Sequence, residues 1–148
     1  MRISAKEDYA IRAVLELARA GSETVKREQI ADAQDIPLAF LENILLELKR
    51  AEIVETQRGP DGGVRLARPA AEITVADIVR AVTGPLATVR GVRPPAIDYP
   101  DSAKPLREVW VALRASLRSI LENVTVADLA SGKLPAAVTK ITRDPNVW

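Results

Sequence analysis

Two residue types that carry much of protein chemistry are missing from this chain, which has no cysteine and no histidine in 148 residues. Without cysteine there are no disulfides, no thiolate nucleophiles and no cysteine-ligated zinc or iron–sulfur sites. Without histidine the chain lacks the most versatile acid, base and metal ligand. It also shows no nucleophile–base pair and no phosphate-binding loop with a following Lys-Ser/Thr. We therefore expect a protein that is not an enzyme and that holds no metal or cofactor.

Aromatic residues, long apolar runs and an excess of one charge are also lacking. Aromatics make up 3% of the chain, so the core must be built from Ala, Leu, Ile and Val, which favours helices over a β-sandwich. No apolar run approaches the ~18 to 20 residues of a membrane span, and no signal-peptide core is visible. We expect a cytoplasmic protein. Its 21 basic and 20 acidic residues give a net charge of +1, so overall charge does not indicate nucleic-acid binding.

The first part of the chain carries a pattern typical of a helix-turn-helix. Residues 4–7 form a capping box that begins a first helix, and a short second helix is predicted over residues 26–33. Pro37 then suits the first turn of a third helix that reaches residue 51, because its missing N–H costs nothing there. A short helix, a turn and a longer helix follow one another as in a helix-turn-helix.

A β-hairpin is predicted directly after these helices. Residues 53–58 and 64–67 are β-prone, and the connection between them, Gly59-Pro60-Asp61-Gly62-Gly63, is rich in turn-forming residues. Its flanks carry basic side chains, Arg58 and Arg65 among them. A basic hairpin directly after a helix-turn-helix is typical of the wing of a winged helix.

The rest of the chain divides into an arm and its connections. A capped helix up to Gly84 completes a predicted winged helix-turn-helix DNA-binding domain of residues 1–84. Residues 85–104 are rich in proline and are predicted to form a loop or linker, a candidate sensor region. Residues 105–132 are expected to form a dimerisation helix and a short capping helix, and residues 133–148 an irregular tail. The expected fold class is mainly α with a small β-hairpin.

The start of the third helix provides the candidate base-reading residues. An α-helix fits the major groove of DNA, where each base pair presents a distinct donor and acceptor pattern. The residues there that the core does not require are Ala39, Phe40, Glu42 and Asn43. Asn43 suits adenine, Glu42 suits a cytosine amine, and Ala39 suits a thymine methyl. Phe40 also suits a core position, because a lone aromatic beside Leu41 is commonly buried.

Basic side chains around these elements are candidates for contacts to DNA phosphates, which need only cations and donors on the correct face. They are Arg2, Lys6, Lys26, Arg27, Arg58 and Arg65. Residues 1–68 hold 11 basic and 12 acidic side chains, so this region is not basic overall. DNA affinity must therefore come from segregation of charge between faces, and we expect it to depend strongly on salt.

The long helix after residue 105 carries an apolar stripe that a small head domain cannot easily cover. The stripe comprises Leu106, Val109, Trp110, Leu113, Leu117, Ile120 and Leu121. Two such helices packed across a two-fold axis bury the stripe. The sequence thus predicts a homodimer on double-stranded DNA, and the symmetry of a dimer implies a palindromic operator.

Several segments resemble the Rrf-type winged-helix family of bacterial transcription regulators, the IscR/NsrR/CymR-like group. They are Met1-Arg2-Ile3-Ser4, Tyr9-Ala10, Leu41-Glu42 followed by Leu48, the wing at 58–67, Ile73–Val79 and Val124–Leu129. The wing pattern Arg-Gly-Pro-x-Gly-Gly is the most specific of these. The resemblance implies a homodimer whose third helix enters the major groove and whose long helix crosses to the partner. By position it places Ala39, Glu42 and Asn43 where the family reads bases, and Arg58, Gly59, Gly62 and Gly63 in the wing.

The stretch 85–104 departs from the family pattern. Members that sense iron, nitric oxide or redox state usually carry three cysteines there, and this chain has none. Asp98, Tyr99 and Asp101 offer oxygen atoms, but two carboxylates on such a loop are far more often solvated than metal-bound. We expect a transcription regulator, a repressor, that does not act through a cysteine-ligated cluster. Its control stays open between a small-molecule effector, a protein effector and protein abundance alone.

An alternative function is a winged-helix protein-interaction module that has lost operator binding. The near-neutral charge of residues 1–68 favours this alternative. Asn43, Arg58 and the complete glycine wing favour the regulator.

Overall fold

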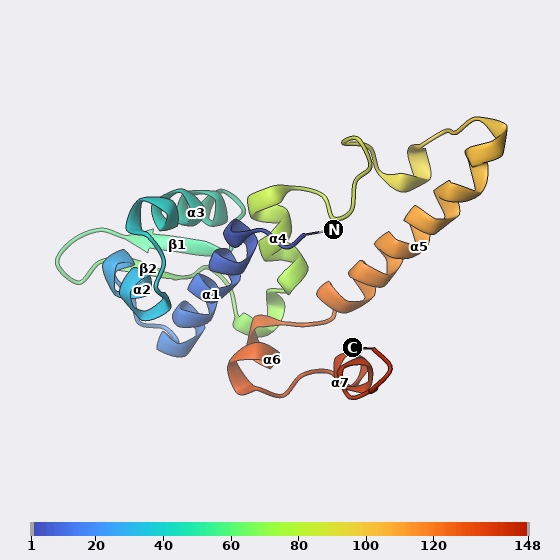
Figure 1. Cartoon of the computed structure of the whole chain (residues 1–148). Helices are drawn as coiled ribbons and strands as arrows, with labels where there is room; N and C mark the ends of the chain where they lie inside the picture. The colour runs from blue at the N-terminus through green and yellow to red at the C-terminus, as the bar shows by residue number, and fades with distance from the viewer. Residues whose placement is uncertain (1, 148) are drawn as a thin grey trace.

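The computed structural model describes residues 2–147, which form an elongated molecule with a helical head and a projecting arm (Figure 1). The helices are α1 (Ala5–Ala20), α2 (Arg27–Gln34), α3 (Leu38–Arg50), α4 (Val75–Thr83), α5 (Lys104–Leu121), α6 (Val126–Ser131) and α7 (Ala136–Thr142). Strands β1 (Val54–Gln57) and β2 (Gly63–Leu66) pair as an antiparallel hairpin. The predicted fold class, mainly α with a small hairpin, is confirmed. No helix within residues 2–147 is both long and apolar enough to cross a membrane.

Helix α1 forms the centre of the head. It begins at the predicted capping box, where the backbone N–H of Ser4 donates to Glu7 Oε2 at 2.7 Å and Ser4 Oγ accepts from the backbone N–H of Glu7. Its inward face consists of four fully buried side chains: Ala10, Ala13, Val14 and Leu17. Because the side chains of the two alanines are small, the other head helices can approach α1 closely on this face.

The turn between α2 and α3 is fixed by one residue in the left-handed region. Asp35 has φ 51° and ψ 51°, and its N–H donates to the carbonyl of Ala31. This turn sends Ile36 into the core, where it is 4% exposed. Pro37 lies at the N-cap of α3 rather than inside its first turn, and its carbonyl accepts from Phe40 and Leu41 at 3.0 Å each. The helix-turn-helix is therefore held by backbone hydrogen bonds as well as by apolar packing.

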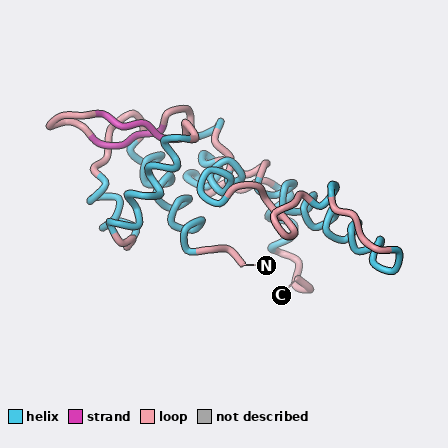
Figure 2. The backbone as a smooth tube through the Cα atoms, turned by 90° about the horizontal axis from the view of Figure 1, so that it is seen from above, coloured by secondary structure: helices cyan, strands magenta, loops and turns pink. Residues whose placement is uncertain are grey.

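The hairpin is attached to the head through the segment that precedes α2. Val25 and Val64 exchange two backbone hydrogen bonds of 2.8 Å, and Val64 is buried. Glu55 faces Arg65 directly across the two strands, and their side chains form an ion pair. The hairpin extends from the head at the end opposite to α5 (Figure 2).

Helix α4 contributes to two hydrophobic clusters. Ile78 and Val82 lie in the head core, whereas Val75, Ala76 and Val79 lie in a second cluster with the end of α5, α6 and α7. The segments before α4 and before α6 repeat the same Thr-Val-Ala-Asp capping box, and they pair antiparallel through Thr74 and Thr125. The head and the C-terminal part of the chain are thereby joined by main-chain as well as side-chain contacts.

One part of the predicted domain division needs correction. The sequence placed a boundary at residue 84, but Val126 of α6 is fully buried in the head core together with α1 and α3 residues. The head core is therefore completed by a residue from the far end of the chain. No local pattern reveals this, because Val126 reads as part of a separate short helix.

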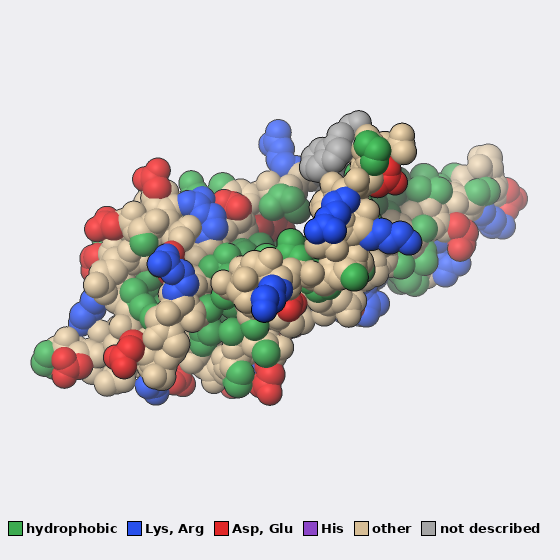
Figure 3. Space-filling model, turned by 90° about the horizontal axis from the view of Figure 1, so that it is seen from below, with side chains coloured by type: hydrophobic (Ala, Val, Ile, Leu, Met, Phe, Trp, Pro, Cys, Tyr) green, Lys and Arg blue, Asp and Glu red, His purple; other side chains and the backbone are tan. Residues whose placement is uncertain are grey.

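Helix α5 projects from the head and contains no buried residue. Only its last turn contacts the second cluster, through Ile120 and Leu121. Further out, Trp110 and Leu113 line a hollow of about 330 Å³ against residues 87–94. Leu106 and Val109 are 38% and 56% exposed. Hydrophobic side chains thus remain on the surface of the arm, which lies at the right in Figure 3.

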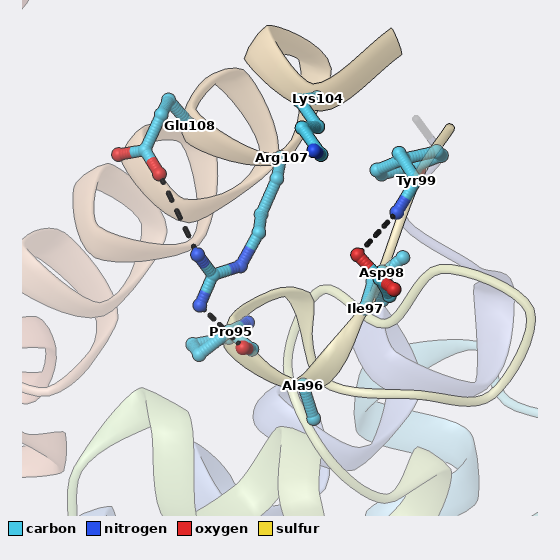
Figure 4. A pocket seen from close by; sticks show the side chains of 8 residues that line it. All are labelled: Pro95, Ala96, Ile97, Asp98, Tyr99, Lys104, Arg107 and Glu108. Atoms are coloured by element: carbon cyan, nitrogen blue, oxygen red, sulfur yellow. Dashed lines mark hydrogen bonds and ion pairs between the residues drawn. The ribbon is translucent and has the colours of Figure 1, made fainter. Parts of the chain in front are cut away.

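The segment between α4 and α5 is a loop with two short 3₁₀ turns at 94–96 and 101–103. Leu86, Pro94 and Ile97 of this linker are buried, and Leu86 belongs to the second cluster. At its outer end Arg107 of α5 donates to the carbonyl of Pro95 at 2.7 Å and faces Glu108 (Figure 4). These contacts make the linker an ordered part of the structure.

The tail was expected to be irregular, and this expectation is wrong for residues 136–142, which form α7. Pro135 lies at the N-cap, where its φ of −55° starts the helix and its missing N–H costs nothing. Val138 packs against the second cluster and gives the helix a buried anchor. The prolines at 135 and 145 therefore flank a helix rather than prevent one.

An ion pair at the base of α5 predicts a pH effect on stability. Glu122 accepts from Arg118 at 2.9 Å and from Arg80 of α4, and these bonds lower its pKa from 4.5 to about 2. A depressed carboxyl pKa stabilises the fold fully above about pH 4.5, and this stabilisation is lost as pH falls towards 2. We expect Glu122→Gln to reduce the fall in Tm between pH 5 and pH 3, measured by circular dichroism. Equal falls in Tm for both proteins contradict this role of Glu122.

Candidate nucleic-acid interface

Helix α3 separates a buried face from an exposed one. Leu41, Ile44, Leu45 and Leu48 face the core, which leaves an exposed stripe of Ala39, Glu42, Asn43 and Leu46. Positions three, four and seven residues apart lie on the same side of a helix. The predicted base readers Ala39, Glu42 and Asn43 are therefore neighbours on one surface, with Leu46 as a fourth member. We call this surface the α3 stripe.

Two members of the α3 stripe already have partners within the chain. Glu42 forms an ion pair of 3.0 Å with Arg27 of α2, which fixes both side chains beside each other. Asn43 Nδ2 donates to the carbonyl of Ala39 at 3.3 Å, one turn earlier. This single bond leaves the second amide proton and the carbonyl oxygen of Asn43 available to an adenine edge.

Phe40 occupies a position between core and solvent. It is 44% exposed, and its ring meets the edge of the Tyr9 ring of α1 with centroids 5.7 Å apart. The structure thus places Phe40 at the seam between α1 and α3, beside the α3 stripe rather than in it. The core position that the sequence also suggested for Phe40 is only partly correct.

The wing depends on two glycines where another chain segment approaches closely. A Cβ on Gly62 would lie 2.3 Å from the carbonyl oxygen of Gln57, and a Cβ on Gly63 would lie 2.7 Å from the carbonyl oxygen of Val25. Gly59 meets no such contact but has φ 103°, which side chains rarely adopt. The three glycines that the sequence placed in the wing are therefore required by its geometry.

The wing tip is held by the segment before α2. Thr24 Oγ1 donates to the carbonyl of Asp61 at 2.9 Å, and Lys26 Nζ donates to the carbonyl of Pro60 at 3.2 Å. Lys26, a candidate phosphate ligand, thus lies at the wing tip and also stabilises it. Thr24 had no role in the sequence analysis, because a loop threonine carries no pattern of its own.

The six basic candidates fall into two groups. Lys6, Arg27 and Arg65 pair with carboxylates of the same chain, Glu47, Glu42 and Glu55 respectively. Lys26 donates to a carbonyl, whereas the exposed side chains of Arg2 and Arg58 have no hydrogen-bond or ion-pair partner in the part of the chain that is described. Of these two, Arg58 lies on the wing.

A groove between α3 and the hairpin was not predicted. It has a volume of about 210 Å³ and is lined by Arg27, Glu42, Leu45, Leu46, Lys49, Thr56 and Val64. Lys49 Nζ donates to Thr56 Oγ1 at 2.8 Å and ties α3 to β1. Leu46 and Lys49 continue the helical spacing that starts at Ala39, so this spacing was the signal available in the sequence.

Known proteins of similar sequence are transcription regulators. The HTH-type transcriptional regulator Rv1287 of Mycobacterium tuberculosis is 47% identical over 145 residues, which cover 97% of this chain and 90% of that protein. The HTH-type transcriptional regulator CymR of Bacillus subtilis is 31% identical over 132 residues, covering 88% and 91%.

Solved structures of transcription regulators have a fold similar to that of this chain. The structure of CymR, the global cysteine regulator of B. subtilis, has a TM-score of 0.76 and 30% identity, covering 88% of this chain and 97% of that one. The structure of IscR from T. potens has a TM-score of 0.73 and 28% identity, covering 89% and 88%. The winged-helix fold predicted from the sequence is therefore confirmed.

The Rrf2 family model, described as an iron-dependent transcriptional regulator, matches residues 3–132. The residues of this chain do not fit an iron site of the cysteine-ligated kind, because the sequence has no cysteine and no histidine. Within residues 2–147 the carboxylates do not supply one either, since no three of them gather closely enough to hold a metal ion. With its helix-turn-helix, its wing and these relatives, the chain belongs to the Rrf2 family of DNA-binding transcription regulators, which are not enzymes, as a member without cluster-ligating cysteines.

Proposed function

We propose that the protein acts as a homodimeric repressor that binds a palindromic operator without an iron–sulfur cluster. The observation that carries the dimer is the uncovered outer part of α5, an 18-residue helix with no buried residue and with Leu106 and Val109 exposed. An amphipathic helix is stable when its apolar face packs against another element. A second copy of α5 across a two-fold axis supplies that element.

The α3 stripe and the wing support sequence-specific binding by each half of the dimer. The stripe presents Ala39, Glu42 and Asn43 to the major groove, and Arg58 lies on the wing beside it. A symmetric dimer repeats this arrangement, so that the half-sites lie about one helical turn or a multiple apart. We infer repression in the cytoplasm, by a dimer that binds across a promoter and thereby excludes polymerase.

Selection of bound DNA from a random pool tests the operator directly. The purified, metal-free protein is used at two salt concentrations, because phosphate contacts weaken as salt rises. We expect an enriched palindrome at both concentrations and weaker binding at the higher one. Enrichment of a single half-site contradicts the dimeric operator. Absence of any enrichment contradicts metal-free operator binding.

Substitutions in α3 and in the wing are expected to have different effects. Asn43→Ala removes a base contact, so we expect a loss of discrimination of about 1 to 3 kcal/mol at one position of each half-site. Arg58→Ala removes a phosphate contact and weakens binding to all sequences more evenly. Fluorescence anisotropy on the operator and on a scrambled duplex measures both. Equal losses for the two variants on both duplexes contradict this division.

One observation favours the alternative of a protein-interaction module. Three of the six candidate phosphate ligands, Lys6, Arg27 and Arg65, are neutralised by carboxylates of the same chain. A surface with paired charges suits a protein partner better than a polyanion. The same selection experiment separates the two functions, since an interaction module enriches no sequence.

A further inference from the structure

The junction between head and arm holds an excess of arginine. Arg80 of α4, Arg93 of the linker, and Arg114 and Arg118 of α5 come from three separate segments, and the acidic partner among them is Glu122. A hollow of about 250 Å³ opens at this place and is lined by Arg80, Gly84, Pro85, Arg93 and Arg114. Four positive charges around one negative charge leave an excess of three.

The hydrogen bonds of the junction do not neutralise all four of these arginines. Glu122 accepts from both Arg80 and Arg118. Arg114 donates to the carbonyl of Leu86, which is a neutral acceptor. The Arg93 side chain has no hydrogen-bond or ion-pair partner within the described residues 2–147. Burial, followed by the charges of Arg118, Arg93 and Arg80, lowers the pKa of Arg114, as expected where like charges gather.

The hollow at the tip of the arm has a different balance of charge. There Lys104 pairs with Asp101. Figure 4 shows Arg107 bonded to the Pro95 carbonyl and facing Glu108. Lys104 and Arg107 thus each have a partner within the chain, and Asp98 adds a further carboxylate to the lining of this hollow. An anion is therefore not needed at the tip, whereas the junction lacks its counter-charge.

We propose that the junction binds a small anion with at least two negative charges, carried by carboxylate or phosphate groups. The guanidinium group presents a planar fork of donors that matches carboxylate and phosphate oxygens. The lining residues Arg80, Arg93 and Arg114 converge on the hollow from α4, the linker and α5. A bound anion bridges these three segments and couples the arm to the head.

Isothermal titration calorimetry on the full-length protein tests the site, with citrate and pyrophosphate as probes at constant ionic strength. We expect saturable binding of at least one probe, with one site per chain. Arg93→Gln removes a cation that has no other partner, and its Kd is expected to rise about tenfold. Glu122→Gln removes the competing carboxylate, and its Kd is expected to fall. The matched control Arg19→Gln changes net charge equally at an exposed position of α1, and its Kd is expected to stay unchanged.

Three outcomes overturn the proposal. The first is the absence of saturable heat with both probes. The second is an equal Kd for Arg93→Gln and Arg19→Gln, which indicates that the probes bind elsewhere or respond only to net charge. The third is a lower molecular mass for Arg93→Gln in solution, which indicates that the arginines hold carboxylates of a second copy. The titration contains no DNA, so its result is independent of operator binding.

Discussion

Val109→Asp is expected to convert the protein from a dimer to a monomer. Val109 is 56% exposed on an arm that has no buried residue, so the substitution removes no contact from the core of a single chain. In the proposed dimer it places an unpaired carboxylate in an apolar interface. The expected loss is about 3 kcal/mol or more, roughly a hundredfold or more in the dimer Kd. Sedimentation equilibrium measures the change against twice the 16.1 kDa of one chain.

A matched control separates this effect from a general effect of added charge. Leu46→Asp likewise introduces a carboxylate, at a side chain that is 47% exposed on α3 of the head. We expect it to leave the dimer intact. Circular dichroism is expected to show native helix content in both variants. A Val109→Asp protein that keeps the mass of a dimer means that another surface joins the two copies.

Gly62→Ala is expected to displace the wing. The added Cβ would lie 2.3 Å from the carbonyl oxygen of Gln57 and 2.8 Å from the carbonyl carbon of Arg58, and both are backbone atoms. Since backbone cannot move aside as a flexible side chain does, the turn must change its shape. Overpacking of this kind costs about 1 to 3 kcal/mol, which urea unfolding measures. Operator affinity is expected to fall as well, because Arg58 moves with the turn.

Pro60→Ala in the same turn is the control for this substitution. The carbonyl of Pro60 accepts from Lys26, and alanine keeps that carbonyl. We expect its stability and its operator affinity to stay close to those of the unchanged protein. A Gly62→Ala protein as stable as Pro60→Ala would show that the turn has room that the structure does not indicate.

The head could be predicted from the sequence because its signals are local. The capping box at Ser4, the proline before α3 and the glycine-rich turn of the wing each determine backbone geometry within a few residues. The apolar spacing of α3 also decides which of its side chains face outward. Its buried residues left Ala39, Glu42 and Asn43 exposed, as the sequence indicated.

The sequence did not reveal which charges pair, because pairing depends on distant segments. Lys6 lies 41 residues from its partner Glu47, and Arg80 lies 42 residues from Glu122. Without these contacts every exposed cation looks equally available to phosphate. The apolar stripe of α5 shows the same limit, since Ile120 and Leu121 pack within the chain while Val109 stays exposed. Periodicity gives the face of a helix but not the element that covers it.

The position of Val126 bears on any attempt to isolate the DNA-binding half of the molecule. A fragment that ends at residue 84 lacks Val126, whose side chain is fully buried in the head, and it uncovers Val75, Ala76 and Val79 of α4. Such a fragment has a cavity in the head core where Val126 is missing, and it exposes an apolar patch on α4 that favours aggregation. Two-hybrid baits, truncation alleles and recombinant fragments that end at this point are therefore expected to be destabilised. Fragments that keep α6 retain Val126 and with it the complete head core.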